Sequence, residues 1–305
     1  MYKNHFKVVL LALVLFNLAG CKKEPATGTD EDCQVIVFFS TQSVSASLLK
    51  ATPPTPATGA ETLIEEIILF GVDASDNVIQ SFVLDDPEFT GQEIDAFRNT
   101  VMFYAIANPS DDMKNPSLFN PETIADFEDL LADFSDAPES PFLMSGTGEV
   151  ETSSEGDRYA LIVLVRAIAK VEIEGIDDFN LESVTVINTP DLGYVFAGES
   201  LVPLEAETTE YPTVNSVVNG KITVYVAENS MDSPTQFVVN GTYEGQQISY
   251  NLVLKKMNGD VLDIERNTYY KVVITGDPTK FGSISINIPE WEDEITDDQE
   301  FTESE

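Results

Sequence analysis

Residues 219–259 read NGKITVYVAENSMDSPTQFVVNGTYEGQQISYNLVLKKMNG, and this stretch decides the fold class. It contains three short runs rich in β-branched and aromatic residues, which are typical of strands. Asn-Gly, a strong signal for a tight turn between strands, occurs at 219–220, 240–241 and 258–259. Many short strands with turns at this spacing predict a β-sandwich.

The same pattern continues on both sides of this stretch. Residues 73–77 lie between two strand-like runs and predict a hairpin turn. The other expected strands are Ile64–Val72, Val78–Val83, Thr100–Ala107, Ala160–Val165, Ala169–Ile173, Leu181–Ile187, Tyr269–Ile274 and Gly282–Ile288. A polar run at Ser153–Asp157 interrupts them. We therefore expect an all-β chain with two similar sandwich domains, 34–155 and 156–305, of which the second ends in an acidic tail.

One short helix is expected in the first domain. Asn120 can cap its first turn, and Pro121 suits the first helical position. The apolar residues that then fall on one helical face are Ile124, Phe127, Leu130, Leu131 and Phe134. This spacing predicts a helix that packs on a sheet.

The N-terminus predicts export as a lipoprotein. Val8–Phe16 is an apolar run that is too short to span a bilayer and has the length of a signal-peptide core. Leu18-Ala19-Gly20-Cys21 follows and is similar to the lipobox of bacterial lipoproteins, in which the Cys thiol is acylated and the preceding segment removed. We expect residues 1–20 to be a signal peptide, Cys21 to carry lipid and 21–33 to be an acidic tether. A plain secretory signal with an incidental Cys21 is the alternative.

Composition excludes several kinds of partner and site. The chain carries 16 Lys+Arg against 53 Asp+Glu, a formal net charge of −37, which makes nucleic acid and anionic lipid headgroups poor partners. The one histidine, His5, lies in the expected signal peptide, so the mature chain has no Ser-His-Asp or Cys-His pair and no His-ligated metal. Because Cys21 is expected to carry lipid, Cys33 is the only remaining thiol, and no internal disulfide is expected.

No motif predicts catalysis, a cofactor or a metal site. The sequence has no Gly-rich phosphate loop, no Cys-x-x-Cys and no Ser nucleophile elbow. Acid clusters such as Asp85-Asp86 and Asp111-Asp112 lack the ordered spacing of a calcium loop and favour solvated turns. Chance pairs of carboxylates are expected at this acid content, so a carboxylate-based hydrolase is the weakest of the functions considered.

The first strand of the mature chain decides how the protein is expected to assemble. This strand is apolar on both faces and consists of Val35, Ile36, Val37, Phe38 and Phe39. Its loss would leave a hydrophobic slot and unpaired backbone groups, both of which favour addition of a strand from a partner. A Pro-rich loop follows at Ser40–Ala60, and its single basic residue, Lys50, offers an exposed cleavage site.

Several segments together resemble the fimbrillins, the type V pilins of Bacteroidetes-type bacteria. The resemblance rests on their order and spacing over nearly the whole mature chain. The segments are the lipobox with its acidic tether, LLKA at 48–51, ETLIEEIILF at 61–70, FLMSG at 142–146, VRAIAKV at 165–171, VYVAEN at 224–229, IERNTYYKV at 264–272 and INIPEW at 286–291.

The resemblance implies two transthyretin-like β-sandwich domains, exported as a lipoprotein to the outer membrane. It also implies that a trypsin-like protease cuts the loop after the first strand, where we expect the cut between Lys50 and Ala51 because Lys50 is the only basic residue of the loop. The strand Val35–Phe39 would leave with the lipid, and a strand from another subunit would fill the groove. The partners expected on this basis are other fimbrial subunits, the outer membrane through the lipid on Cys21, the maturation protease and a host or bacterial receptor. The expected location is the fimbrium, with a lipid-anchored precursor in the outer membrane.

Two departures from the family pattern keep alternatives open. Many fimbrillins have Arg at the cut, and an Arg-specific protease would not recognise Lys50. The tail Glu292–Glu305 is acidic, and Ile295 and Phe301 are its only large apolar residues, which makes it a poor donor strand. An uncut anchor or a tip subunit is therefore the alternative to a polymerising shaft subunit. A monomeric surface lipoprotein that binds glycan or host protein is a further one.

Overall fold

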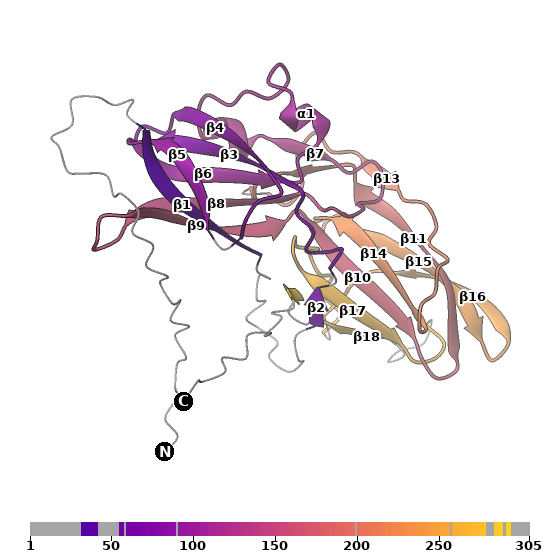
Figure 1. Ribbon diagram of the computed structural model, residues 1–305. Helices are drawn as coiled ribbons and strands as arrows, with labels where there is room; N and C mark the ends of the chain where they lie inside the picture. Colours follow the sequence, from indigo (N-terminus) through magenta and orange to yellow (C-terminus); the bar gives the residue numbers. More distant parts are fainter. Residues whose placement is uncertain are drawn as a thin grey trace, which may run out of the picture.

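The computed structural model describes residues 32–41, 55–57, 59–89, 91–198, 200–256, 258–278, 284–288 and 291–293. These residues form mainly β-strands, which are arranged in sandwich-like sheets (Figure 1). The all-β fold class predicted from the sequence is confirmed. Cys21, Lys50 and Ala51 lie outside the described residues, so lipid attachment and cleavage there stay predictions.

The first half of the chain forms a seven-stranded sheet that curves around its own core. Its strand order is β4 (Val78–Asp85), β3 (Glu66–Asp73), β6 (Thr100–Ala107), β8 (Met144–Thr152), β9 (Arg158–Arg166), β1 (Asp32–Thr41) and β5 (Gln92–Phe97). The edge strands β4 and β5 approach each other. Gln80 Nε2 of β4 donates a hydrogen bond to Asp95 O of β5 (3.1 Å), and Gln80 Oε1 accepts one from Phe97 N (2.9 Å). The inner face is apolar along every strand. The sequence pattern predicted β1, β3, β4, β6 and β9 of this sheet, whereas β5 and β8 were not predicted.

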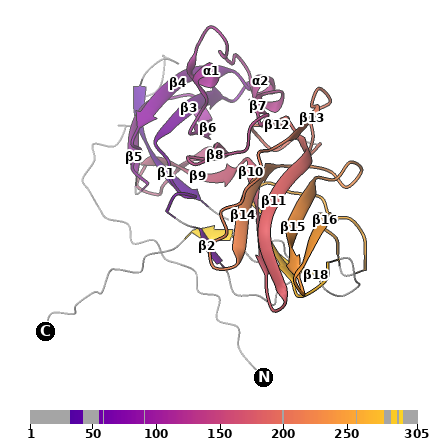
Figure 2. The ribbon, with the colours of Figure 1, turned by 90° about the vertical axis from the view of Figure 1, so that its right-hand side faces the viewer.

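The second half is a sandwich of two four-stranded sheets (Figure 2). One sheet contains β14 (Lys221–Ala227), β10 (Ile168–Gly175), β17 (Tyr269–Ile274) and β18 (Ile284–Asn287) in that order. The other contains β13 (Thr208–Glu210), β11 (Phe179–Pro190), β15 (Gln236–Tyr243) and β16 (Gln246–Leu252). Alternate apolar residues of both sheets pack into one core.

The sheets divide at Ala167, between β9 and β10. β9 follows the polar run Ser153–Asp157 in the sequence, but it pairs with β1 and β8 of the first sheet. The division between the sheets therefore lies C-terminal to the domain boundary expected at 155/156. A third apolar cluster, which includes Phe70, Phe127 and Tyr269, joins the two halves.

Two small sheets complete the described structure. β7 (Leu131–Asp133) pairs antiparallel with β12 (Leu192–Tyr194). β2 (Thr55–Ala57) pairs parallel with β19 (Trp291–Asp293) and so brings together segments from near the two ends of the chain.

The helix prediction is wrong in extent and in number. The first half has two one-turn helices, α1 (Asp111–Lys114) and α2 (Ala125–Glu128). α2 begins after Ile124, which makes no side-chain cap bond, and Asn120 is not its cap. Phe127 is buried in the aromatic cluster, whereas Leu131 belongs to β7. The helical spacing is overridden because Leu131–Asp133 pairs with another strand instead of continuing the helix.

One of the three turns predicted at Asn-Gly pairs, the one at 240–241, is not present. Asn219 and Gly220 have positive φ, as a tight turn requires, and Gly259 does too. Gly241, however, lies inside β15, where a Cβ atom would come within 2.4 Å of Asn180 O, so glycine allows a close approach of β11. The hairpin turn between β15 and β16 lies at Glu244-Gly245, both with positive φ.

Candidate functional site

The candidate site is the position of β1 in the seven-stranded sheet, which we call the β1 groove. β1 pairs antiparallel with β5, where Val37 lies opposite Gln92, and parallel with β9, where Val37 lies opposite Ala160. Val35 and Val37 are 0% exposed and Phe39 is 4% exposed. Ile36 and Phe38, on the other face, are half-buried. The strand expected from the sequence is present, with one face fully buried and the other partly covered.

The walls and floor of the β1 groove belong to the rest of the sheet. Without β1, β9 would lose its ladder partner along this side, and β5 would lose the only strand with which it pairs in the described structure. The residues of these two strands that lie opposite β1 on the buried face are apolar, and we call them the floor of the groove: Ile94, Ala96, Ala160 and Ile162. An apolar slot between two strands with unpaired backbone groups binds an extended segment.

Cys33 lies in β1, is buried and is disulfide-bonded. The sequence analysis expected no internal disulfide, and this expectation is wrong for the described chain. Its premise was that Cys21 carries lipid and so leaves Cys33 as the only remaining thiol.

A buried polar network fixes the chain where it emerges from the Pro-rich loop. The Glu61 carboxylate lies 2.6 Å from Lys170 Nζ and accepts a hydrogen bond of 2.6 Å from the Tyr225 hydroxyl. Arg166 Nε donates to the backbone O of Glu61 (2.9 Å), and Arg166 Nη1 donates to Asn267 Oδ1 (2.9 Å). Burial and the neighbouring Glu61 carboxylate raise the pKa of Tyr225 far above its ordinary value. Through this network, the segment after the loop is attached to β10 and β14.

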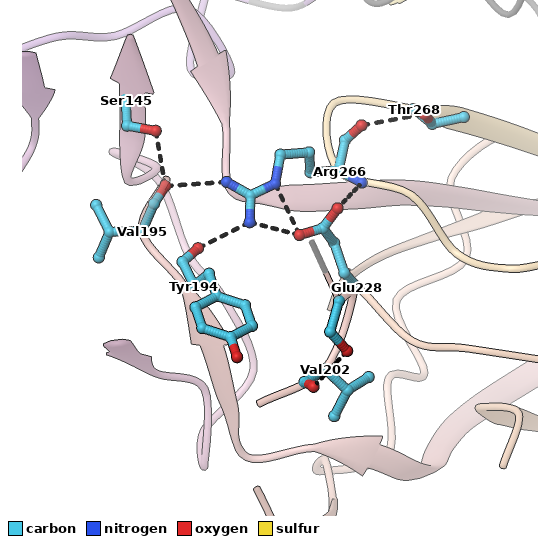
Figure 3. Close-up of polar contacts among 8 residues, drawn as sticks. Ser145, Tyr194, Val195, Val202, Glu228, Arg266 and Thr268 are labelled. Atoms are coloured by element: carbon cyan, nitrogen blue, oxygen red, sulfur yellow. Dashed lines mark hydrogen bonds and ion pairs between the residues drawn. The ribbon is translucent and has the colours of Figure 1, made fainter. Parts of the chain in front are cut away.

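A second buried network joins the two halves through Arg266 (Figure 3). The Arg266 guanidinium bonds both to the Glu228 carboxylate, through Nε at 2.7 Å and Nη2 at 2.5 Å, and to backbone oxygens of Val195 and Tyr194 at 2.9 and 2.8 Å. Val195 O also accepts from the Ser145 hydroxyl of β8 (2.6 Å). The guanidinium therefore connects a loop held by the first sheet to the end of β14.

Both networks were missed by sequence reasoning, because each joins residues that lie far apart in the chain. Arg166 and Arg266 were noted only as parts of longer motifs. A usable signal was present, since Arg166 interrupts an apolar strand run in a chain with only 16 basic residues. A buried charge at such a position requires a partner.

Asp73 stabilises the turn at 73–77. Asp73 accepts hydrogen bonds from the backbone N–H groups of Asn77 and Ser75, which lower its pKa. Among the described residues, no group of three or more His, Cys, Asp or Glu side chains is placed to hold a metal ion. The described helices include none with the length and apolarity needed to cross a membrane.

Comparison with known proteins identifies relatives over most of the chain. A family model described as fimbrillin-A associated anchor proteins Mfa1 and Mfa2 matches residues 59–297. The matched range begins just before Glu61 and leaves out β1. A search of curated proteins gives no match.

Solved structures share the fold over nearly their full length. A putative cell adhesion protein from Parabacteroides distasonis aligns with TM-score 0.61 and 18% identity, covering 88% of this chain and 98% of that chain. A putative cell adhesion protein from Bacteroides eggerthii aligns with TM-score 0.59 and 11% identity over 87% and 98%. A fimbrial assembly protein from Parabacteroides distasonis aligns with TM-score 0.53 and 12% identity over 86% and 96%. At these identities the likeness concerns the fold.

Proposed function

Because the chain belongs to the family of fimbrillin-A associated anchor proteins Mfa1 and Mfa2, we propose that it is a lipid-anchored anchor subunit of a fimbrium that keeps β1 in its sheet. The family is a structural one and not a family of enzymes. The chain is thus a fimbrial protein, and the proposal concerns how it is attached and what fills its β1 groove.

Lipid attachment at Cys21 is supported by the sequence before it. A basic start, a short apolar core and Leu18-Ala19-Gly20 directly before the cysteine are the features that lipoprotein export requires. The chain has two cysteines and Cys33 is disulfide-bonded in the described structure, so the proposal requires that this bond be absent once the Cys21 sulfur carries lipid. The lipid would place the protein in the outer membrane, at the base of a fimbrium.

Retention of β1 is supported by its two ladders and its buried face. β1 pairs with β5 and β9 along most of its length, and its loss would expose the apolar floor of the groove. Lys50 would not be recognised by an Arg-specific protease, and the acidic composition of residues 292–305 makes a poor donor strand. Membership of the family of fimbrillin-A associated anchor proteins points the same way. These features together favour a subunit that ends a fibre over one that extends it.

A second candidate is a polymerising subunit, and the geometry of the groove favours it. Cleavage between Lys50 and Ala51 would release β1 with the lipid, and a strand from another subunit would then fill the β1 groove. The partners in both cases are other fimbrial subunits. A receptor on a host or another bacterium is compatible with either role.

The attachment is tested by fractionating cells that express the Cys21→Ser variant. Loss of the protein from the outer membrane, with fimbriae released into the medium, is the expected result. Lys50→Ala is the matched control, because it changes the same exported chain without touching the lipid site, and it should leave the membrane fraction unchanged. Membrane attachment of Cys21→Ser at the wild-type level would refute the proposal.

A further inference from the structure

Two of the four arginines in the chain lie at one turn, and we call them the arginine pair. Arg98 belongs to the turn that joins β5 to β6, and Arg158 is the first residue of β9. The Arg158 guanidinium donates to two backbone oxygens at this turn, to Phe97 O through Nη1 (3.5 Å) and to Thr100 O through Nη2 (2.5 Å). Burial and then the charge of Arg98 lower the pKa of Arg158. An anion bound beside the two arginines would relieve the repulsion between them.

The same turn contains buried polar atoms for which the described residues provide no hydrogen-bond partner. They are Asn99 Oδ1 and Thr100 Oγ1, and Thr100 is 1% exposed. Most buried polar atoms in folded proteins are hydrogen-bonded. The Thr100 hydroxyl can donate to a carboxylate, as a guanidinium can. The turn therefore has donor capacity that a further acidic segment could use.

The arginine pair lies at the end of the seven-stranded sheet that is remote from the second half. β9 runs from Arg158 to Arg166, and the sheets divide at the next residue. β1 runs parallel to β9, so its first residue, Asp32, lies at the same remote end (Figure 1). The chain that comes from Cys21 therefore enters the sheet beside the arginine pair.

The register of β1 indicates which acid of the tether meets the arginine pair. β1 pairs antiparallel with β5, and this ladder begins with Asp32 opposite Phe97. Glu31 lies outside the described residues, and one more step of the ladder would place it opposite Arg98. Because side chains alternate along a strand, both positions belong to the face on which Ala96 is buried. Opposite charges at directly opposed positions of an antiparallel pair stabilise the pairing.

We propose that the arginine pair binds the acidic tether, with the Glu31 carboxylate beside Arg98 and Arg158 and with β1 extended by one residue. The occupant is a segment of the same chain, which its register and its charge indicate. The inference rests on the proposed function, because it gives the arginine pair the role of fixing where the lipid tether leaves the fold. The remote end of the seven-stranded sheet then faces the membrane, and the second half points away from it.

Hydrogen exchange tests this contact in the mature chain, residues 21–305, with Cys21→Ser, which carries no lipid and forms no internal disulfide. Arg98→Gln and Glu31→Gln should each speed exchange at residues 30–32 about threefold, because each removes one partner of the pair. The double variant should exchange no faster than either single one. Lys256→Gln is the matched control, since it removes the same charge from an exposed position, and it should leave this exchange unchanged. Unchanged exchange in Arg98→Gln, or effects of the two substitutions that multiply in the double variant, would overturn the proposal.

The other possible occupant of the arginine pair is a phosphate group of the membrane surface. Sedimentation of the same chains with phosphatidylglycerol vesicles separates the two occupants. Neither the parent chain nor Arg98→Gln should bind the vesicles, because the chain is strongly acidic. Binding that is lost in Arg98→Gln and kept in Glu31→Gln would overturn the proposal and assign the arginine pair to the membrane.

These measurements are independent of lipid attachment, because the chain used has serine at position 21. If Cys21 proved to carry no lipid, a measured coupling between Glu31 and Arg98 would still stand, and the proposed function would be the part that failed. If the coupling were absent while Cys21 carried lipid, the contact would be the part that failed.

Discussion

The carboxylate of Glu61 lies 2.6 Å from Nζ of Lys170, and the two side chains are 1% and 8% exposed. Glu61 is the first buried residue after the Pro-rich loop that contains Lys50, whereas Lys170 lies in β10 of the second half. β1 is attached to the rest of its sheet through the ladders with β5 and β9, whereas Glu61 is fixed to the second half of the chain by this ion pair.

Breaking this pair should destabilise the protein strongly. Lys170→Met leaves the Glu61 carboxylate buried without its cation, and we expect a loss of about 3–5 kcal/mol in the free energy of unfolding by urea. Lys114→Met is the control, because the Lys114–Glu66 pair is partly exposed, with side chains 38% and 21% exposed. That change should cost much less, because solvent screens an exposed pair. Equal losses in the two variants would mean that the buried network does not fix the segment.

The Arg266 network should depend on the planar guanidinium and not on charge alone. Arg266→Lys keeps the charge but loses the simultaneous contacts to Glu228 and to the oxygens of Val195 and Tyr194. The expected loss is about 2 kcal/mol or more in urea unfolding. Lys271→Arg, at a partly exposed pair with Glu174, should change stability by less than about 0.5 kcal/mol. If Arg266→Lys left the free energy of unfolding unchanged, the planar geometry of the guanidinium would not be needed for stability.

Buried tyrosines should make the fold sensitive to alkali. Burial is the main cause that raises the pKa of Tyr211 from 10.0 to about 12, and its hydroxyl donates to Phe134 O (3.0 Å). The unfolded state loses this proton first, so the stabilising contribution is complete below pH 10 and is lost as the pH rises to about 12. The urea midpoint of unfolding should fall as the pH rises from 10 to about 12. The midpoint of the Tyr211→Phe variant should fall less steeply over the same range. A slope unchanged by the substitution would exclude Tyr211 as a contributor.

The β1 groove should accept β1 as a separate peptide. A chain that starts at Ala51 is expected to bind a labelled peptide of residues 32–41, because the peptide restores two ladders and covers the apolar floor. A peptide with aspartate at the positions of Val35 and Val37 is the control and should bind at least about a hundredfold more weakly, since it buries two charges. Fluorescence anisotropy of the label measures both. Similar binding of the two peptides would argue against a specific groove.

The strands could be predicted because their apolar residues recur at alternate positions, a local property of the sequence. Thr100–Ala107 was predicted with the bounds that β6 has. The same reasoning failed where distant segments decide the structure. The apolar spacing at 124–134 is helical, yet Leu131 belongs to a strand because β12 offers it a ladder.

The candidate site could be predicted only in part from the sequence. The apolar run at 35–39 identified β1, but the parallel pairing with β9 depends on where a strand from beyond the polar run packs. The ion pairs of Glu61 and Arg266 join segments that become neighbours only in the folded chain. Charge type alone gives no signal for which of 53 acids will meet a given base.

The central claim is that this fimbrial protein is anchored by lipid and keeps β1. Intact mass and N-terminal sequencing of the protein taken from the cell surface test it most directly. The account predicts a lipidated chain that begins at Cys21 and still contains Val35–Phe39. A chain that begins at Ala51 would contradict it, because β1 would then have left the sheet and the β1 groove would be open to a strand from another subunit.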